Sequence, residues 1–320
     1  MRCQSAVAVL AAALLLGASQ VAAADPAGVP AGSGPPQSDH GQAAVYARRH
    51  PDAVPAGVND FGCKPAAGRR FPVVLAHGTD SNAYSDWAGI APLLVRAGYC
   101  VFAPNYGGLP GATTFGLDDM FVGARQIAAF VDRVLHATGA RQVDLVGFSQ
   151  GATVTRLFVN RLGGAPKVRK WVGLASPSYG GTFYGVVPLV QAIPGLTSVA
   201  TGALPAALVQ QMQGSEFLAA LNAGGDTVAG PDYTTIGSRV DEVIQPYTNI
   251  ALRSPGARNV LLQELCPADL TGHFHLPYDP FVQQLLLHTL AGADTPRPQC
   301  RPVPMGTGIP SVIWSAHFAG

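Results

Sequence analysis

Near its middle the chain carries the pentapeptide GFSQG (Gly147–Gly151), preceded by the apolar run VDLV (Val143–Val146) and followed by ATVT (Ala152–Thr155). A G-x-S-x-G pentapeptide between a β-rich run and a helix is the sequence context of a nucleophile elbow. This is a sharp strand-to-helix turn that exposes a serine hydroxyl. Close packing of the strand and helix leaves no room for a Cβ on either side of the serine, which explains the two glycines. We predict that Ser149 is a nucleophile; the alternative is an ordinary turn.

Apolar runs and helical patterns alternate on both sides of this pentapeptide. The runs before and after it are apolar on both faces, which is typical of parallel strands buried under helices. Right-handed crossovers would place the loops that follow these strands at one edge of the sheet. We expect strands at 71–76, 99–103, 143–146 and 168–175, and helices at 85–97 (with Pro92 favouring a kink or a later start), 120–138 and 152–162.

The alternation breaks at about 180–230, a Gly-, Ala- and Pro-rich stretch with short helical fragments at 204–213 and 216–221. It is either an inserted cap-like segment above the serine or a passive surface excursion. Strands at 233–237 and 259–265 and a helix at 280–290 follow. The sequence thus predicts an α/β fold, with a mostly parallel central sheet and helices on both faces.

A serine hydroxyl needs a base to take its proton and an acid to orient that base. In this kind of fold the acid follows a strand after the elbow, and the base comes before the last helix. Asp241, in the loop beyond the strand at 233–237, is the expected acid. Glu242 is its rival, and the alternative to a catalytic role is a surface salt bridge with Arg239. His273 is the expected base and His275 the runner-up.

The remaining histidines have weaker claims. His77 precedes Gly78 at the end of the first strand and is expected to orient that loop, and His288 lies within the last predicted helix. The other four, His40, His50, His136 and His317, have no supporting context.

An acyl-transfer intermediate needs backbone donors for its oxyanion. In this fold one donor is the residue after the nucleophile and the other lies in the loop after the His-Gly strand. The expected donors are therefore the N–H groups of Gln150 and Thr79.

Composition narrows the class of protein. Hydrophobic residues make up 48% of the 320 residues and charged residues 12%, while Gly and Pro together form about a fifth of the chain. These values indicate a large core with many turns. The formal net charge of +1 gives no electrostatic case for nucleic acid. No Cys or His cluster has metal-ligand spacing, and we expect no cofactor.

The first residues have the pattern of a secretory signal: Arg2, an apolar core at 6–17 and the small-residue exit Ala22–Ala24. We predict cleavage after Ala24 and a secreted protein. The expected organisation is a signal peptide (1–24), a loosely ordered leader (25–60), one main domain (61–300) and a C-terminal tail (301–320) without a clear role.

Export makes disulfides the expected state of the four later cysteines. Four cysteines allow three pairings, and the sequence alone does not choose between them. The short loops favour Cys63 with Cys100 and Cys266 with Cys300.

Several stretches, taken in order, resemble the secreted actinobacterial lipases of the class 2 lipase family. They are 72–79, 98–103, 143–151, 221–227, 241–243 and 265–270, the last leading to His273, and they span roughly residues 56–300. The resemblance implies an α/β-hydrolase fold, carboxylic ester hydrolysis and a triad of Ser149, Asp241 and His273. It also supports the two disulfide pairings. Phe148 departs from the family, which usually has His before the serine, and makes the elbow more like that of cutinases.

The expectation is therefore a secreted serine ester hydrolase acting on lipid or other small esters, with transient contact with lipid interfaces. Three alternatives stay open: a cutinase-like polyesterase, an acyltransferase of the same fold, and a non-catalytic binding protein on a hydrolase scaffold.

Overall fold

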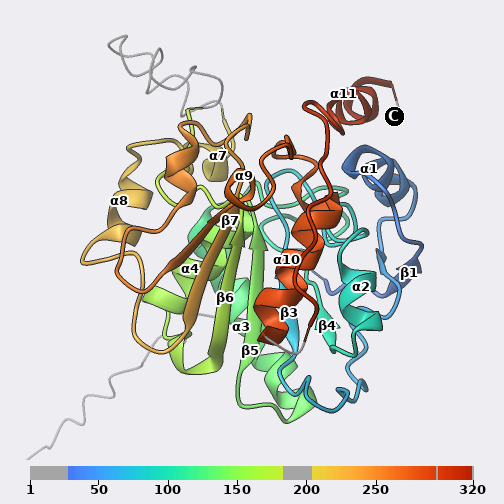
Figure 1. Cartoon of the computed structure of the whole chain (residues 1–320). Helices are drawn as coiled ribbons and strands as arrows, with labels where there is room; N and C mark the ends of the chain where they lie inside the picture. Colours follow the sequence, from blue (N-terminus) through green and yellow to red (C-terminus); the bar gives the residue numbers. More distant parts are fainter. Residues whose placement is uncertain (1–27, 183–203, 293–294, 319–320) are drawn as a thin grey trace, which may run out of the picture.

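A computed structural model describes residues 28–182, 204–292 and 295–318. Its centre is a six-stranded parallel sheet in the order β4-β3-β5-β6-β7-β8 (Figure 1). The strands are β3 (Val73–Ala76), β4 (Val101–Phe102), β5 (Val143–Phe148), β6 (Val168–Leu174), β7 (Asp232–Gly237) and β8 (Arg258–Leu261). The predicted α/β class is confirmed, because helices follow these strands on both faces of the sheet.

The helices that pack on the two faces of the sheet include α2 (Ala91–Arg96), α3 (Met120–Thr138), α4 (Gln150–Arg161) and α10 (Pro280–Ala291). Successive residues of a strand point to opposite faces, and β3 shows the consequence. Val73 and Leu75 belong to the core shared with α2 and α10, whereas Val74 and Ala76 belong to the core shared with α3 and α4. The sheet is therefore buried on both sides, as its uninterrupted apolar runs predicted.

Local signals set the bounds of α3. The Asp119 side chain accepts a hydrogen bond from the N–H of Phe121 and caps the start, and Gly139, in the left-handed conformation, ends the helix. The predicted range 120–138 is confirmed.

Two other predicted ranges are longer than the elements observed. The helix expected at 85–97 has the later start that Pro92 indicated: it begins at Ala91, because proline is accommodated in the first turn but not in a helix interior. The strand expected at 259–265 ends at Leu261, after which α9 (Leu262–Leu265) forms a single helical turn. An apolar run this short fits a strand or a buried helix, and periodicity alone could not separate them.

Both flanks of the main domain are more ordered than expected. Residues 32–55, expected to be a loose leader, form β1 (Gly32–Gly34), α1 (His40–Arg49) and β2 (Ala53–Pro55). The expected tail contains α11 (Ile309–Phe318), which lies against α1 (Figure 1). Because these contacts join the two ends of the chain, composition near either end could not reveal them.

The stretch at about 180–230 lies only partly within the described residues. Its described part contains α7 (Ala206–Gln210) and α8 (Glu216–Asn222), which correspond to the two predicted helical fragments. The predicted signal peptide, 1–24, lies outside the described residues. In the part of the chain that is described, no helix has the length and apolar character needed to cross a bilayer.

The structure pairs Cys63 with Cys100 and Cys266 with Cys300, as predicted. The second disulfide has a consequence for the site. It ties the segment leading to α11 to the loop leading to His273, and the N–H of Leu270 donates to the carbonyl of Val303 beside it, at 2.8 Å.

Candidate active site

Ser149 lies at the turn between β5 and α4, at the carboxyl edge of the sheet. Its φ of 52° and ψ of −123° are sterically unfavourable for a residue with a side chain. The turn is held because the Ser149 N–H donates to the carbonyl of Leu174 on β6, at 2.8 Å. A Cβ at Gly147 would collide with the backbone of Ala152, and one at Gly151 with the carbonyl of Ala76. The predicted elbow geometry is therefore present.

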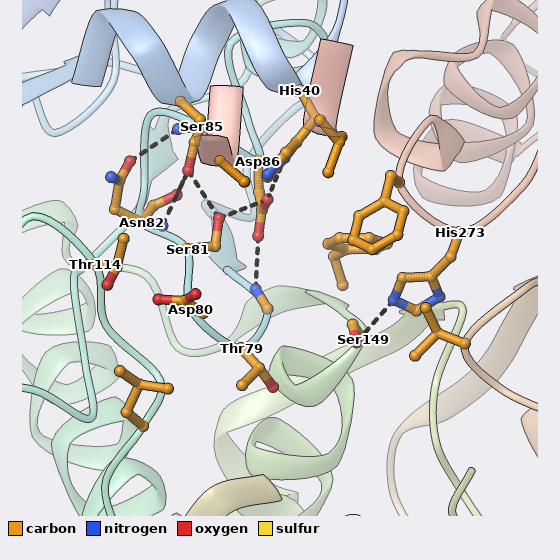
Figure 2. Close-up of a pocket in the computed structure, with 18 of the residues that line it drawn as sticks. His40, Thr79, Asp80, Ser81, Asn82, Ser85, Asp86, Thr114, Ser149 and His273 are labelled. Carbon is orange, nitrogen blue, oxygen red and sulfur yellow. Dashed lines mark hydrogen bonds and ion pairs between the residues drawn. The ribbon is translucent and has the colours of Figure 1, made fainter. Parts of the chain in front are cut away.

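Three of the predicted site residues meet at this edge. His273 Nε2 lies 3.0 Å from Ser149 Oγ (Figure 2). On the other side of the ring, His273 Nδ1 lies 2.9 Å from Asp241 Oδ2. A carboxylate only accepts hydrogen bonds, so Nδ1 carries the proton and Nε2 presents its lone pair to the serine hydroxyl. Ser149 is 7% exposed, His273 3% and Asp241 0%.

Asp241 is fixed by the turn that follows β7. Its Oδ1 accepts hydrogen bonds from the N–H groups of Val243, at 2.9 Å, and Ile244, at 2.7 Å. These two bonds leave Oδ2 to face His273. The rival, Glu242, instead accepts a 2.7 Å hydrogen bond from the backbone N–H of His273. The alternative of a surface salt bridge with Arg239 is wrong, because Asp241 is fully buried and Arg239 Nη2 lies 3.9 Å from Glu264 Oε1 instead.

Two opposed effects act on the pKa of His273. Burial disfavours the imidazolium, whereas the charge and hydrogen bond of Asp241, with smaller effects from Glu242 and Asp86, favour it. The carboxylates outweigh burial, so the pKa of His273 is raised above its usual value. A raised pKa makes the imidazole a stronger base.

Other histidines lie elsewhere. The His275 ring packs against Tyr278, 6.4 Å between centroids, and burial lowers the pKa of His275. His288 Nδ1 lies 3.1 Å from Thr295 Oγ1. Neither is placed to serve Ser149 in the way that His273 is.

His77 orients a loop, as the sequence indicated. Its Nε2 accepts the N–H of Tyr106 at 3.3 Å, so the proton is on Nδ1, which donates to the carbonyl of Gly78 at 2.8 Å. Burial lowers the pKa of His77 despite the opposing effects of Gly78 and Asp86, and this favours the neutral ring that both hydrogen bonds need.

The two expected oxyanion donors are adjacent in space. Gln150 is the first residue of α4, so its N–H has no partner within the helix. Its side-chain Nε2 donates to Thr79 Oγ1, at 3.2 Å, and to the carbonyl of Gly116, at 2.8 Å. Gln211 of the stretch after α7 also donates to Thr79 Oγ1, at 2.9 Å. Since Thr79 Oγ1 accepts both of these hydrogen bonds, the hydroxyl hydrogen of Thr79 can be donated to another group.

A cavity of about 740 Å³ lies in front of Ser149 (Figure 2). One part of its wall is apolar and is formed by Leu117, Phe148, Pro205, Leu208, Ile244 and Phe274. Another part is polar and is formed by residues of the loops at 79–86 and 113–114. Apolar surface predominates, as expected for a site that accepts an acyl chain.

The flanking helices complete this cavity. His40 and Ala44 of α1 and Val312 and Ala316 of α11 line it. Residues 301–320 were expected to have no clear role and His40 no supporting context, and the structure corrects both expectations. A signal was present for α11, because 309–318 is a mostly apolar decapeptide that follows two glycines.

Comparisons with known proteins place the chain among lipases. A family model for class 2 lipases matches residues 70–285, which include Ser149, Asp241 and His273. Triacylglycerol lipases of Pseudarthrobacter phenanthrenivorans and Burkholderia plantarii are each 40% identical to this chain over 96 residues. That stretch is 28% of this chain and 28% and 25% of the two relatives, so the match spans only about a quarter of their length.

Solved structures show the same fold. Aspergillus fumigatus lipase B aligns with a TM-score of 0.60 at 20% identity, covering 83% of this chain and 63% of that one. The mature form of Bacillus licheniformis lipase BlEst2 aligns with a TM-score of 0.53 at 18% identity, covering 71% of this chain and 94% of that one. At such identities the likeness shows the fold alone, which is that of the α/β hydrolases.

Proposed function

Because the chain belongs to the class 2 lipase family, we propose that it is a secreted serine hydrolase that cleaves carboxylic esters, with acylglycerols as substrates. One observation carries the proposal. Ser149, His273 and Asp241 are joined by consecutive hydrogen bonds of 3.0 and 2.9 Å, and they open on a mostly apolar cavity. This is the arrangement that converts a serine hydroxyl into a nucleophile.

The reaction has two halves. His273 Nε2 takes the proton of Ser149 as Oγ attacks the ester carbonyl, and Asp241 stabilises the imidazolium that forms. The imidazolium then protonates the leaving alcohol, which departs and leaves the acyl group on Ser149. A water molecule, deprotonated by the same imidazole, attacks the acyl-enzyme and releases the carboxylic acid.

Negative charge develops on the carbonyl oxygen in both halves. The proposed donors to this oxygen are the N–H groups of Thr79 and Gln150. The hydroxyl of Thr79, which accepts hydrogen bonds from Gln150 and Gln211, can donate its hydrogen as a third. Losing one such donor typically costs on the order of 10²–10³ in rate. No residue of the proposed mechanism requires a metal or an organic cofactor.

Secretion is supported by three features: the signal-like pattern at 1–24, the two disulfides, and membership of a lipase family. Disulfides form and persist in oxidising compartments outside the cytosol. Recovery of the protein from culture medium, with Asp25 as its first residue, would support this part of the proposal; retention in the cytosol with Met1 intact would contradict it.

An activity profile tests the proposed chemistry. The purified protein is assayed against p-nitrophenyl esters of short and long acyl chains and against an emulsified triacylglycerol, with Ser149→Ala as the control. We expect release of free fatty acid by the native protein and none above background by the variant. Failure to cleave any ester would refute the proposal. If an added acceptor alcohol captures most of the acyl group as a new ester, the protein is an acyltransferase.

A further inference from the structure

A second buried carboxylate, Asp86, lies beside the active site. It is 0% exposed and none of its three partners belongs to the triad. Oδ2 accepts a 2.6 Å hydrogen bond from the N–H of Gly78, Oδ1 accepts one of 2.7 Å from the hydroxyl of Ser81, and His40 Nδ1 lies 3.1 Å from Oδ1 (Figure 2). Taking a carboxylate out of water is costly, so this set of partners requires an explanation.

Asp86 holds both ends of the loop that carries Thr79. Gly78 and Ser81, its two hydrogen-bond donors, flank Thr79 and Asp80. Asp80 has a φ of 53°, in the left-handed region that is unfavourable for a residue with a side chain. The Asp86 carboxylate thus bridges the two ends of a strained turn, at Gly78 and at Ser81.

The same contacts determine where the N–H of Thr79 points. The peptide between Gly78 and Thr79 is planar and trans, so its C=O and N–H point in opposite directions. His77 holds the C=O at 2.8 Å, while Asp86 fixes the preceding N–H of Gly78 at 2.6 Å. With both sides of Gly78 held, rotation about its backbone bonds is blocked. The N–H of Thr79 therefore keeps the direction opposite to His77.

His40 reaches Asp86 from outside the part of the chain that matches the family model. It is the first residue of α1, whereas the match covers residues 70–285. Helix α1 is in turn attached to α11: Ser311 Oγ donates to Asp39 at 2.7 Å, and Arg48 Nη2 donates to the carbonyl of Ser315 at 2.7 Å. A Cβ at Gly41 would collide with the backbone of Ser311, so the two helices touch closely.

We propose that Asp86 and His40 form a positioning pair that holds the Thr79 N–H towards the oxyanion, and that helix α1 takes part in the reaction through this pair. The inference rests on the proposed ester hydrolysis. Neither residue touches the reacting atoms. Asp86 acts through the Gly78–Thr79 peptide, and His40 acts through Asp86.

His40 supplies one of the partners that a buried carboxylate needs. Its Nδ1 lies 3.1 Å from Oδ1 of Asp86, beside the hydrogen bonds from Gly78 and Ser81. Burial alone would raise the pKa of Asp86, but the hydrogen bonds and charge of its neighbours, His40 first among them, lower it below its usual value. Asp86 is therefore ionised at neutral pH.

The charge of Asp86 also affects the pKa of the catalytic base, His273. The ionisable groups that interact with Asp86 are His40 of α1, His77 at the end of β3, Tyr106 after β4, Tyr278 of η3 (Leu276–Tyr278) and His273. His273 additionally feels Asp241 and Glu242, and all three carboxylates raise its pKa. Removing the charge of Asp86 should therefore lower the pKa of His273.

The test measures kcat, KM and the pH dependence of kcat/KM for a soluble p-nitrophenyl ester. Asp86→Asn keeps an acceptor for Gly78 but loses the charge, and Asp86→Ala loses both. We expect kcat to fall roughly tenfold in Asp86→Asn and on the order of 10²-fold in Asp86→Ala, which approaches the loss of one oxyanion donor, while KM stays within about threefold. The acid limb of the profile, where kcat/KM falls because His273 becomes protonated, should move to lower pH in both variants.

Asp144→Asn is the matched control. Asp144 is also a buried carboxylate with a cationic partner, Arg169, but it lies at the other end of β5, roughly 16 Å from Ser149. We expect this variant to lose stability without a shift of the acid limb. If Asp144→Asn shifts the limb as Asp86→Asn does, the effect is structural and the inference is wrong.

Variants of His40 test separately whether His40 acts through Asp86. His40→Ala removes this partner of Asp86 and should lower kcat severalfold while KM stays within about threefold, whereas His40→Gln, whose amide can still donate to Asp86, should restore most of the loss. The double variant His40→Ala/Asp86→Asn should be no slower than Asp86→Asn, because His40 acts only through that carboxylate. Additive losses in the double variant, or a His40→Gln variant as slow as His40→Ala, would overturn the inference. If the native protein cleaves no ester, the proposed function itself fails; if it is active and Asp86→Asn equals it, only this inference fails.

Discussion

Replacing Asp241 by asparagine should nearly abolish activity for a reason that the geometry makes specific. Oδ1 of Asp241 accepts the N–H groups of Val243 and Ile244. The oxygen of an asparagine must take this position, because an NH₂ group there would face two donors. The NH₂ group therefore occupies the position of Oδ2 and points at His273 Nδ1.

A donor at that position forces the wrong tautomer on the imidazole. Nδ1 must give up its proton to accept the amide hydrogen bond, and the proton moves to Nε2, which then cannot accept the proton of Ser149. In a serine protease the equivalent change lowers kcat by about 10⁴. Since Asp241 here is 0% exposed and no solvent can substitute for it, we expect a loss of the same order.

The adjacent Glu242→Gln is the matched control, with the same change of charge one residue along the chain. The glutamine oxygen can still accept the 2.7 Å hydrogen bond from the N–H of His273. We expect kcat within about tenfold of the native value, since no reacting group loses its partner. Both variants are assayed at neutral pH with the same p-nitrophenyl ester, after circular dichroism has shown native folding. If folded Asp241→Asn retains more than a tenth of the native kcat, or if Glu242→Gln is the more damaged, the assignment of the acid is wrong.

Three further outcomes follow from the structure. The carboxylate neighbours of His273 raise its pKa above the 6.5 of an isolated imidazole, and only the neutral imidazole can act as the base. In a pH–rate profile, kcat/KM should therefore fall with decreasing pH through a midpoint above 6.5; a midpoint below about 6 would contradict this. Replacing Cys266 and Cys300 by serine opens a loop with a sequence separation of 34 and should lower the free energy of unfolding by about 3–4 kcal/mol, measured by denaturant titration; an unchanged midpoint of unfolding would contradict this. Gly151→Val would drive a side chain into the carbonyl of Ala76 and should prevent folding of the elbow, seen as loss of soluble protein or of activity; a soluble, active variant would show that the close approach is wrong.

Local signals predicted the centre of the molecule well. The elbow and the end of α3 each depend on residues that are neighbours in the sequence: the glycines beside Ser149 and the terminating Gly139. The proximity of Asp241 and His273 followed from the topology, since the carboxyl ends of parallel strands share one edge of the sheet.

The flanks could not be predicted in the same way. Helices of ten residues are marginal by themselves, and α1 and α11 are stabilised by contacts with each other across more than 250 residues, such as that between Asp39 and Ser311. The pairing of His40 with Asp86 depends on this docking, so no spacing in the sequence indicates it. Long-range contacts therefore set the limit of what the sequence alone revealed.

Covalent labelling tests the central claim most directly. A fluorophosphonate reacts at an appreciable rate only with a serine whose proton is taken by a positioned base. Incubation of the purified protein with the reagent, followed by peptide mass spectrometry, should give one adduct per chain on Ser149, lost in Ser149→Ala and strongly slowed in His273→Ala. An unlabelled native protein, or a label on another serine, would contradict the account.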